Sequence, residues 1–186
     1  MILPDGQTNG MPILDIRRHA QRQSLDDQQS ALSTAGREMC DRLAKTAPRY
    51  ALVVSSPLPR AKETAQRIAG RLDAIEPGLL PDLGSHAASL FGELRTLADW
   101  AALMTEREDA RSFADEQLPV WARIASRAGE HDLVLAVSHG GIIDLPAILL
   151  MQRLGAKLEG ASFGYGEGVR VTYAQGKAMA IEILRT

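Results

Sequence analysis

The sequence predicts an α/β domain whose sheet is mostly parallel and has an antiparallel edge. Short apolar runs alternate with amphipathic stretches of helical period along most of the chain. Near the C-terminus two strand-like runs, 168–174 and 178–184, flank Gln175-Gly176, which indicates a closing hairpin. The 186 residues suffice for one domain with a hydrophobic core. We therefore expect a loose lead-in over 1–11 and a single domain over 12–186.

The individual elements are predicted from the spacing of apolar residues, from residues that cap helices and from prolines that interrupt them. The run 32–47 has Ser33 or Thr34 near its N-cap and Pro48 after it. Pro146 disfavours an early helix start after 140, so that helix should begin near Asp144. A further short strand is expected within 78–83. The expected strands are 12–16, 51–55 and 131–138, and the expected helices are 32–47, 59–72 and 140–155.

Residues 84–130 are the least regular part of the chain. Two helical patterns, 93–104 and 118–129, are separated by the charged run 105–117. We expect 84–130 to form a short helical lid or insertion within the domain.

Composition excludes several classes of function. The net charge is −2 and aromatic residues make up 4% of the chain, which argues against nucleic-acid and membrane-surface binding. The single cysteine, Cys40, rules out an internal disulfide framework and a cysteine-rich zinc site. No apolar stretch reaches the roughly 20 residues of a membrane span, and the first ten residues lack a secretory pattern. The expected compartment is the cytoplasm.

Charged and imidazole side chains follow three of the expected strands. Parallel strands present their carboxyl ends at one rim of a sheet, where ligands bind. Arginine forks suit phosphate oxygens, a glycine-rich helix start offers free N–H groups, and a neutral imidazole can attack phosphorus. The residues concerned are Arg17, Arg18 and His19 after the first strand, Arg60 after the second, and His139, Gly140 and Gly141 after the strand 131–138.

Four segments carry a resemblance to a known family. "RRHA", "LSTAGREMCDRLA", "SSPLPRAKETAQRIA" and "VSHGG" resemble the histidine phosphatase superfamily, the phosphoglycerate mutase-like proteins, from about residue 12 to the end of the chain. The resemblance implies a three-layer α/β/α sandwich. It also implies that His19 becomes phosphohistidine and that Arg18, Arg60 and His139 surround the phosphate. No metal or other cofactor is implied.

The leaving alcohol needs a proton donor. The family places this acid after the third strand, usually as a glutamate. Asp82 stands at about that place, and we favour it over Glu93, which could instead begin a helix. Asp82 could also be only a turn residue after Pro81. His86 is an alternative substitute or substrate contact, although an exposed loop histidine without a role fits it better.

The stretch after His19 departs from the family pattern. "QRQSLDDQQ" replaces the usual polar run with its phosphate-contacting Asn or Thr, so Gln21, Arg22 or Ser24 is expected to bind substrate, together with Gly140. Arg17 stands where the family usually has an apolar residue. We expect it to pair with Asp15, two residues back on the same strand face, rather than with phosphate.

These observations predict a metal-independent phosphatase, a histidine acid phosphatase-type phosphoric monoester hydrolase. The expected partner is a small phosphorylated substrate or a phosphoprotein. A phosphoglycerate mutase-like transfer is the first alternative, but 84–130 is short and lacks a basic cluster for a carboxylated sugar phosphate. A protein phosphohistidine phosphatase and a phosphoryl-binding module without turnover are the others.

Overall fold

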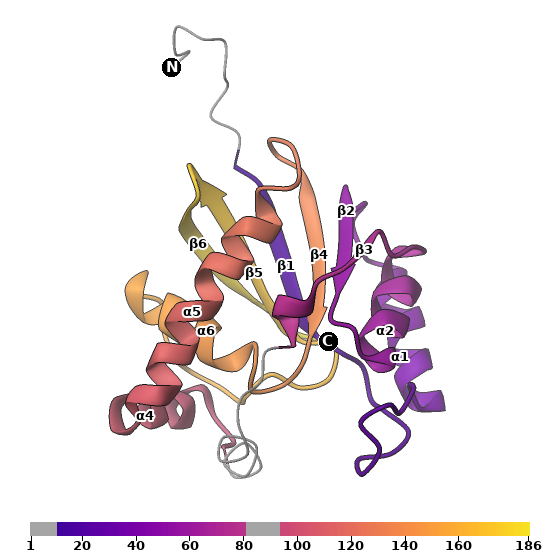
Figure 1. Cartoon of the computed structure of the whole chain (residues 1–186), viewed down its shortest axis with the longest axis horizontal. Coiled ribbons are helices and arrows are strands. Elements are labelled where there is room, and N and C mark those ends of the chain that lie inside the picture. The colour runs from indigo at the N-terminus through magenta and orange to yellow at the C-terminus, as the bar shows by residue number, and fades with distance from the viewer. Residues whose placement is uncertain (1–10, 81–93) are drawn as a thin grey trace, which may run out of the picture.

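The computed structural model of the chain describes residues 11–80 and 94–186. Its described part contains a six-stranded sheet in the order β3-β2-β4-β1-β5-β6 (Figure 1). β1, β2, β3 and β4 run parallel to one another, whereas β5 and β6 form an antiparallel edge. The strands are β1 (Ile13–Arg18), β2 (Leu52–Ser55), β3 (Ala74–Ile75), β4 (Leu133–Ser138), β5 (Gly168–Ala174) and β6 (Lys177–Leu184).

Helices cover both faces of this sheet (Figure 1). α1 (Thr34–Ala44) and α2 (Pro59–Ala69) lie on one face, and α4 (Leu97–Glu106), α5 (Glu108–Ala125) and α6 (Asp144–Arg153) lie on the other. Successive strand residues alternate between the two cores. Leu14 and Ile16 of β1 join the core beneath α4, α5 and α6, while Val53 and Leu135 join the core beneath α1 and α2. The predicted three-layer α/β/α architecture is confirmed.

Local signals account for several element boundaries. The Ser33 hydroxyl accepts from the N–H of Gly36 and begins α1. α6 begins at Asp144 as expected, because Pro146 then falls in the first turn, where backbone N–H groups have no intrahelical partner. Gln175 and Gly176 both have positive φ, as a tight hairpin turn requires.

One predicted boundary was wrong, and one predicted strand is only partly covered. Of the range 78–83, where a short strand is expected, residues 78 and 79 lie in a 3-10 turn, η1 (Pro77–Leu79), and residues 81–83 lie outside the described part; β3 comes earlier. The run 105–117 is helical except at Arg107, where α4 ends and α5 begins. Its acidic residues Glu108 and Asp109 suit the positive end of the α5 dipole, so charge marked a helix start there.

The expected Asp15–Arg17 pair is also wrong. The buried Asp15 carboxylate accepts from Arg170 Nε at 2.7 Å and Nη2 at 2.9 Å, and from the Tyr50 hydroxyl at 3.0 Å. Arg17 instead donates to the carbonyl of Gly166 at 2.7 Å. The reason is strand register, because β5 pairs with β1 so that Arg170 lies directly opposite Asp15.

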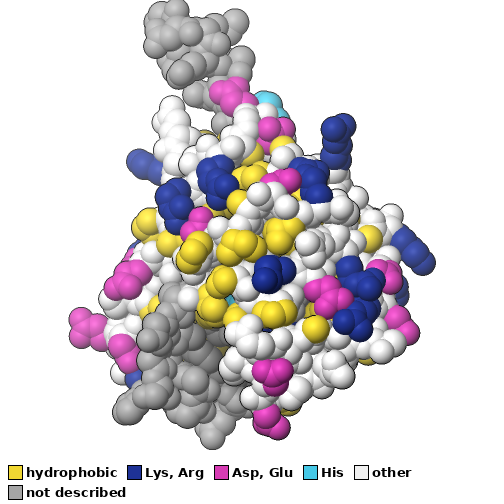
Figure 2. Space-filling model, turned by 45° about the vertical axis from the view of Figure 1, so that its right-hand side comes forward, with side chains coloured by type: hydrophobic (Ala, Val, Ile, Leu, Met, Phe, Trp, Pro, Cys, Tyr) yellow, Lys and Arg dark blue, Asp and Glu magenta, His cyan; other side chains and the backbone are white. Residues whose placement is uncertain are grey.

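The two edges of the sheet differ in length. β3 has two residues and leaves Ile75 42% exposed. Figure 2 brings forward the side of the molecule on which Figure 1 labels β2, β3, α1 and α2. That side shows apolar side chains in its centre with Lys and Arg around them (Figure 2). So short an edge offers few free backbone groups for another strand.

Among the helices of the described residues, none has the length and apolar character to cross a membrane.

Candidate active site

The carboxyl ends of β1 and β4 bring two histidines together. The N–H of His19 donates to the carbonyl of Ser138 at 2.9 Å, which continues the β1–β4 ladder beyond its last pair. The centroids of the His19 and His139 rings lie 5.1 Å apart, and each residue is only 5% exposed. The convergence expected from the strand ends is therefore present.

The His19 ring is held in one tautomer. Nδ1 lies 2.7 Å from the carbonyl oxygen of Ala20, which can only accept, so Nδ1 carries the proton. Nε2 then carries the lone pair, to which Arg60 Nε donates at 3.1 Å. Burial, followed by the positive charges of Arg60, Arg18 and Arg22, lowers the pKa of His19 to about 3. His19 is thus a neutral imidazole with its lone pair turned toward the arginines.

His139 has the same electrostatic setting. Its Nε2 lies 2.6 Å from the hydroxyl of Ser56, the residue that follows β2. Burial, and then the neighbouring His19 and the arginines, lowers the pKa of His139 to about 2. Both imidazoles are therefore neutral at physiological pH.

Arg18 is fixed from three sides. Its Nη1 donates to the carbonyl of Phe163 at 2.9 Å, and its guanidinium lies 4.5 Å from the centroid of the Tyr165 ring. A Cβ on Gly140 would lie 2.8 Å from Arg18 Cζ and 2.9 Å from Nε, closer than such contacts occur. Glycine at 140 therefore leaves the space that the guanidinium occupies.

Arg60 stands in the first turn of α2, directly after Pro59. Its Nη1 donates to the carbonyl of Gln28 at 2.6 Å, while its Nε contacts His19. Burial, followed by repulsion from Arg22, lowers the pKa of Arg60 to about 10, so it stays charged at neutral pH.

Three buried nitrogens at this rim have no hydrogen-bond partner among the described residues. They are Arg18 Nε, Arg22 Nη1 and His139 Nδ1. Buried donors are rarely left unsatisfied, because each costs free energy. The positive charges of Arg18 and Arg22 are also among the causes that lower the pKa of His139. A bound oxyanion would accept from them and offset the charge.

The other predicted site residues divide into two groups. Gln21 accepts from the hydroxyl of Ser33, and Ser24 accepts from the N–H groups of Asp26 and Asp27, so both side chains are engaged within the loop after His19. Their contact with substrate stays a prediction. Asp82, Glu93 and His86 lie outside the described residues.

Several neighbours of the site carried no sequence signal. Thr64, one turn after Arg60, accepts from the N–H of Ala20 at 3.0 Å and fixes the residue after His19. Asp144, whose pKa burial raises, accepts from the N–H groups of Gly141 at 2.8 Å and Phe163 at 3.2 Å. Tyr165 lies between two glycines, a pattern that reads as a turn. These contacts join segments distant in sequence, which only the folded chain brings together.

The described residues hold no group of three or more His, Cys, Asp or Glu side chains placed to bind a metal ion. Cations at the site are supplied by Arg18, Arg22 and Arg60, which lower the pKa of both histidines. The arrangement can bind an oxyanion and present to it the lone pair of His19.

The solved structures that are similar to this chain include three of about the same length. A mycobacterial glucosyl-3-phosphoglycerate phosphatase has a TM-score of 0.61 at 21% identity, covering 93% of this chain and 97% of the other. A phosphoserine phosphatase from Entamoeba histolytica, in complex with 3-phosphoglyceric acid, has a TM-score of 0.55 at 18% identity, covering 94% and 97%. A phosphoglycerate mutase from Bacillus anthracis has a TM-score of 0.63 at 16% identity, covering 95% and 93%. At these identities the likeness establishes a shared fold.

A search of curated proteins gave no match. The sequence profile of the histidine phosphatase superfamily (branch 1) matches residues 14–181, which contain both histidines and all the arginines of the site. The chain therefore belongs to the histidine phosphatase superfamily, branch 1.

Proposed function

We propose that this protein is a metal-independent phosphatase that hydrolyses a phosphomonoester through a phosphohistidine on His19. One observation carries the proposal: the Nε2 lone pair of His19, fixed by the bond from Nδ1 to Ala20, faces a cluster of arginines. A neutral, oriented imidazole is a nucleophile, and the arginines supply the charge that a phosphoryl group needs in the transition state.

The proposed reaction has two steps. In the first, Nε2 of His19 attacks phosphorus, the P–N bond forms and the P–O bond to the leaving alcohol breaks. In the second, water attacks the phosphohistidine, a new P–O bond forms and the P–N bond breaks. The group that protonated the alcohol takes a proton from this water, and phosphate leaves with His19 restored. Arg18, Arg60 and His139 donate to the phosphoryl oxygens in both steps. Because Arg60 Nε already contacts Nε2 at 3.1 Å, an arriving phosphate would insert beside this pair and take over the Arg60 donor.

The proton for the leaving alcohol is proposed to come from Asp82, on the sequence argument alone. For the substrate we propose a small phosphorylated metabolite. The names of two similar structures suggest glucosyl-3-phosphoglycerate and phosphoserine as the first compounds to try.

The test is a time course of p-nitrophenyl phosphate hydrolysis with and without EDTA, on the wild type, His19→Ala and Arg60→Ala. We expect turnover that EDTA leaves unchanged and that His19→Ala abolishes. Arg60→Ala should lose about 100-fold or more in kcat, as when one oxyanion donor is removed. Mass spectrometry after a rapid alkaline quench should find one phosphoryl group on the His19 peptide of the wild type.

Controls separate the possible failures. Circular dichroism must show that the variants fold. Full activity in folded His19→Ala would disprove the nucleophile assignment. If the wild type turns over neither p-nitrophenyl phosphate nor the two named compounds yet binds tungstate, the site binds phosphate-like anions without catalysis of these esters.

A further inference from the structure

A cavity lies at the opposite end of the sheet from the active site. It is bounded by α5, by the C-terminal end of α6 and by the β5–β6 hairpin, and its volume is about 820 Å³. Tyr173 marks its position, because the N–H of Tyr173 bonds to Pro12, beside the first residue of β1. His19 follows the last residue of β1, roughly 20 Å away at about 3.3 Å per residue.

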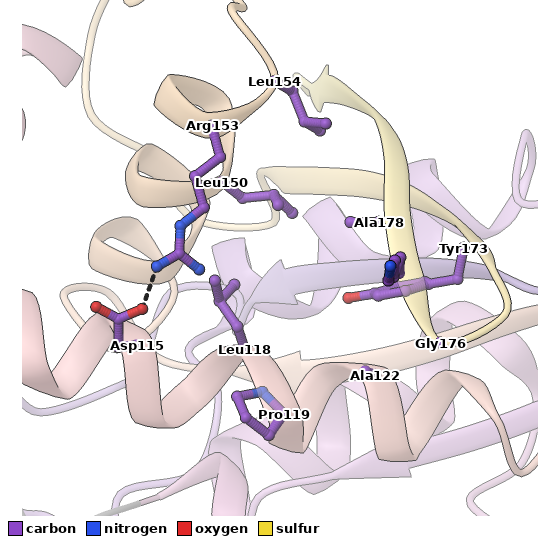
Figure 3. A pocket seen from close by; sticks show the side chains of 11 residues that line it. Asp115, Leu118, Pro119, Ala122, Leu150, Arg153, Leu154, Tyr173, Gly176 and Ala178 are labelled. Atoms are coloured by element: carbon purple, nitrogen blue, oxygen red, sulfur yellow. Dashed lines mark hydrogen bonds and ion pairs between the residues drawn. The ribbon is translucent and has the colours of Figure 1, made fainter.

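The walls of this cavity are mostly apolar. Leu118, Pro119 and Ala122 face it from α5. Leu150 of α6 and Leu154, the residue directly after α6, face it from the other side (Figure 3). Ligand sites commonly have volumes of about 300–1,000 Å³, mostly apolar walls and few polar groups. The cavity meets each of these criteria.

One polar group in the cavity lacks a partner. Tyr173 is only 4% exposed, and its hydroxyl has no hydrogen-bond partner among the described residues. Figure 3 shows its ring reaching from the hairpin toward Leu118 on the facing helix. Burial raises the pKa of this phenol above its ordinary value, so the group is a protonated donor. An unpartnered buried donor destabilises the fold, and a ligand acceptor would offset that cost.

Positive side chains outnumber negative ones around the cavity. Arg153 and Asp115 form an ion pair across it, drawn as the dashed line in Figure 3. Lys177, exposed at the turn of the hairpin, has no ion-pair partner among the described residues. These three side chains therefore leave one positive charge uncompensated, which favours an anionic ligand.

We propose that this cavity is a second binding site, and that it takes a small organic monoanion with an apolar body, of the kind represented by a medium-chain carboxylate. The apolar part lies between the leucines of α5 and α6. The carboxylate lies near Lys177 and accepts from Tyr173.

The test is isothermal titration of the full-length protein with decanoate, below its micellar concentration. We expect one decanoate to bind per chain, and decyltrimethylammonium, with a similar tail and the opposite charge, to bind about tenfold more weakly. Ala122→Trp, which fills the space between the helices, should abolish binding. Tyr173→Phe should weaken it about two- to tenfold, the range for one hydrogen bond.

Variants of exposed lysines test the proposal without disturbing the hydrophobic core, so a loss of binding cannot be due to unfolding. Lys177→Glu should weaken decanoate binding at least about threefold, whereas Lys157→Glu, the same charge change outside the cavity, should leave it unchanged. Saturating phosphate should not alter the affinity, because it occupies the other site. The proposal is overturned if millimolar decanoate does not bind, or if it binds equally to wild type, Ala122→Trp and Lys177→Glu. It is also overturned if sedimentation shows a dimer that Ala122→Trp dissociates, since a second copy would then cover the cavity.

Discussion

The guanidinium of Arg18 lies 4.5 Å from the centroid of the Tyr165 ring. Tyr165 belongs to the segment before β5, and this segment is hydrogen-bonded to Arg18 at the end of β1. The carbonyl of Glu167 accepts from the N–H of Arg18 at 2.8 Å, and the N–H of Gly166 donates to the carbonyl of Arg18 at 3.1 Å. With the side-chain bond to Phe163, this segment holds Arg18 through both backbone and side chain. Tyr165 is thus placed to position Arg18, the arginine for which we propose a contact with phosphate.

Replacing Tyr165 with Leu should reduce kcat/KM. Loss of a cation–π contact worth about 0.5–2 kcal/mol corresponds to roughly a two- to thirtyfold decrease. Tyr165→Phe keeps the aromatic face and serves as the matched control, so it should retain most of the activity. Steady-state kinetics on a phosphomonoester would decide. Equal losses in the two variants would assign the effect to the hydroxyl instead of the ring.

Gly140→Ala should impair phosphate binding more than stability. The new Cβ would come within 3.1 Å of Arg18 Cζ, Nε and Nη1, so the guanidinium must move. We expect KM, and the inhibition constant of phosphate, to rise about tenfold, as for a displaced charge-assisted hydrogen bond. The melting temperature should change little because the substitution displaces one partly buried side chain that belongs to neither hydrophobic core. An unchanged inhibition constant would show that Arg18 can shift without cost.

The two site histidines should make the protein less stable in acid. Their folded-state pKa values, about 3 for His19 and about 2 for His139, lie below the ordinary value of 6.5. The unfolded chain therefore takes up protons below about pH 6.5 that the folded chain does not, and stability falls as pH decreases from there toward 3. Each histidine contributes about 1.4 kcal/mol per pH unit in that window.

Urea unfolding at pH 6.0, 5.25 and 4.5 would measure this slope in the wild type and in His19→Gln. The variant has no imidazole at position 19, so its free energy of unfolding should fall less steeply, by about 1.4 kcal/mol per pH unit. NMR should also show His19 neutral, with the proton on Nδ1, at pH 5. Parallel slopes for the two proteins would mean that His19 protonates in the folded state near its ordinary pKa.

The acid assignment predicts a dependence on the leaving group. Protonation matters most when the leaving alcohol is a poor one. Asp82→Asn should therefore slow hydrolysis of an alkyl phosphate about 100-fold or more, yet affect p-nitrophenyl phosphate only slightly. Glu93→Gln is the matched comparison and should leave both rates near wild type. The reverse pattern would transfer the role to Glu93.

The strands and helices that the sequence predicted well have strong periodic or capping signals. The buried run ending at Ser138 and the hairpin around Gln175 needed no tertiary information. The charged segment 105–117 does not look helical in the sequence, because a helix with few apolar residues has the same polar composition as a loop. α5 still buries Ala114 and Gln117 there, against elements that the local sequence does not reveal.

The site shows the same division. The placement of His19, Arg18, Arg60 and His139 could be predicted because each ends a strand, directly follows one or lies in the first turn of a helix, and topology alone brings such positions together. Arg17 and Asp15 could not, because their partners Gly166 and Arg170 depend on the register of β5. Tyr165 and Thr64 act through contacts across 40 or more residues of chain, which no local pattern encodes.

The bond from the His19 N–H to the Ser138 carbonyl has a consequence for how this protein can vary. Arg18 is paired with Ser138, so the next residue on each strand is a histidine, and their separation is a property of the backbone ladder. Lengthening or shortening the connections 20–51 or 56–132 would leave that separation unchanged. Evolution could thus change the length of these connections, and with it the shape of the substrate site, while the two imidazoles keep their spacing.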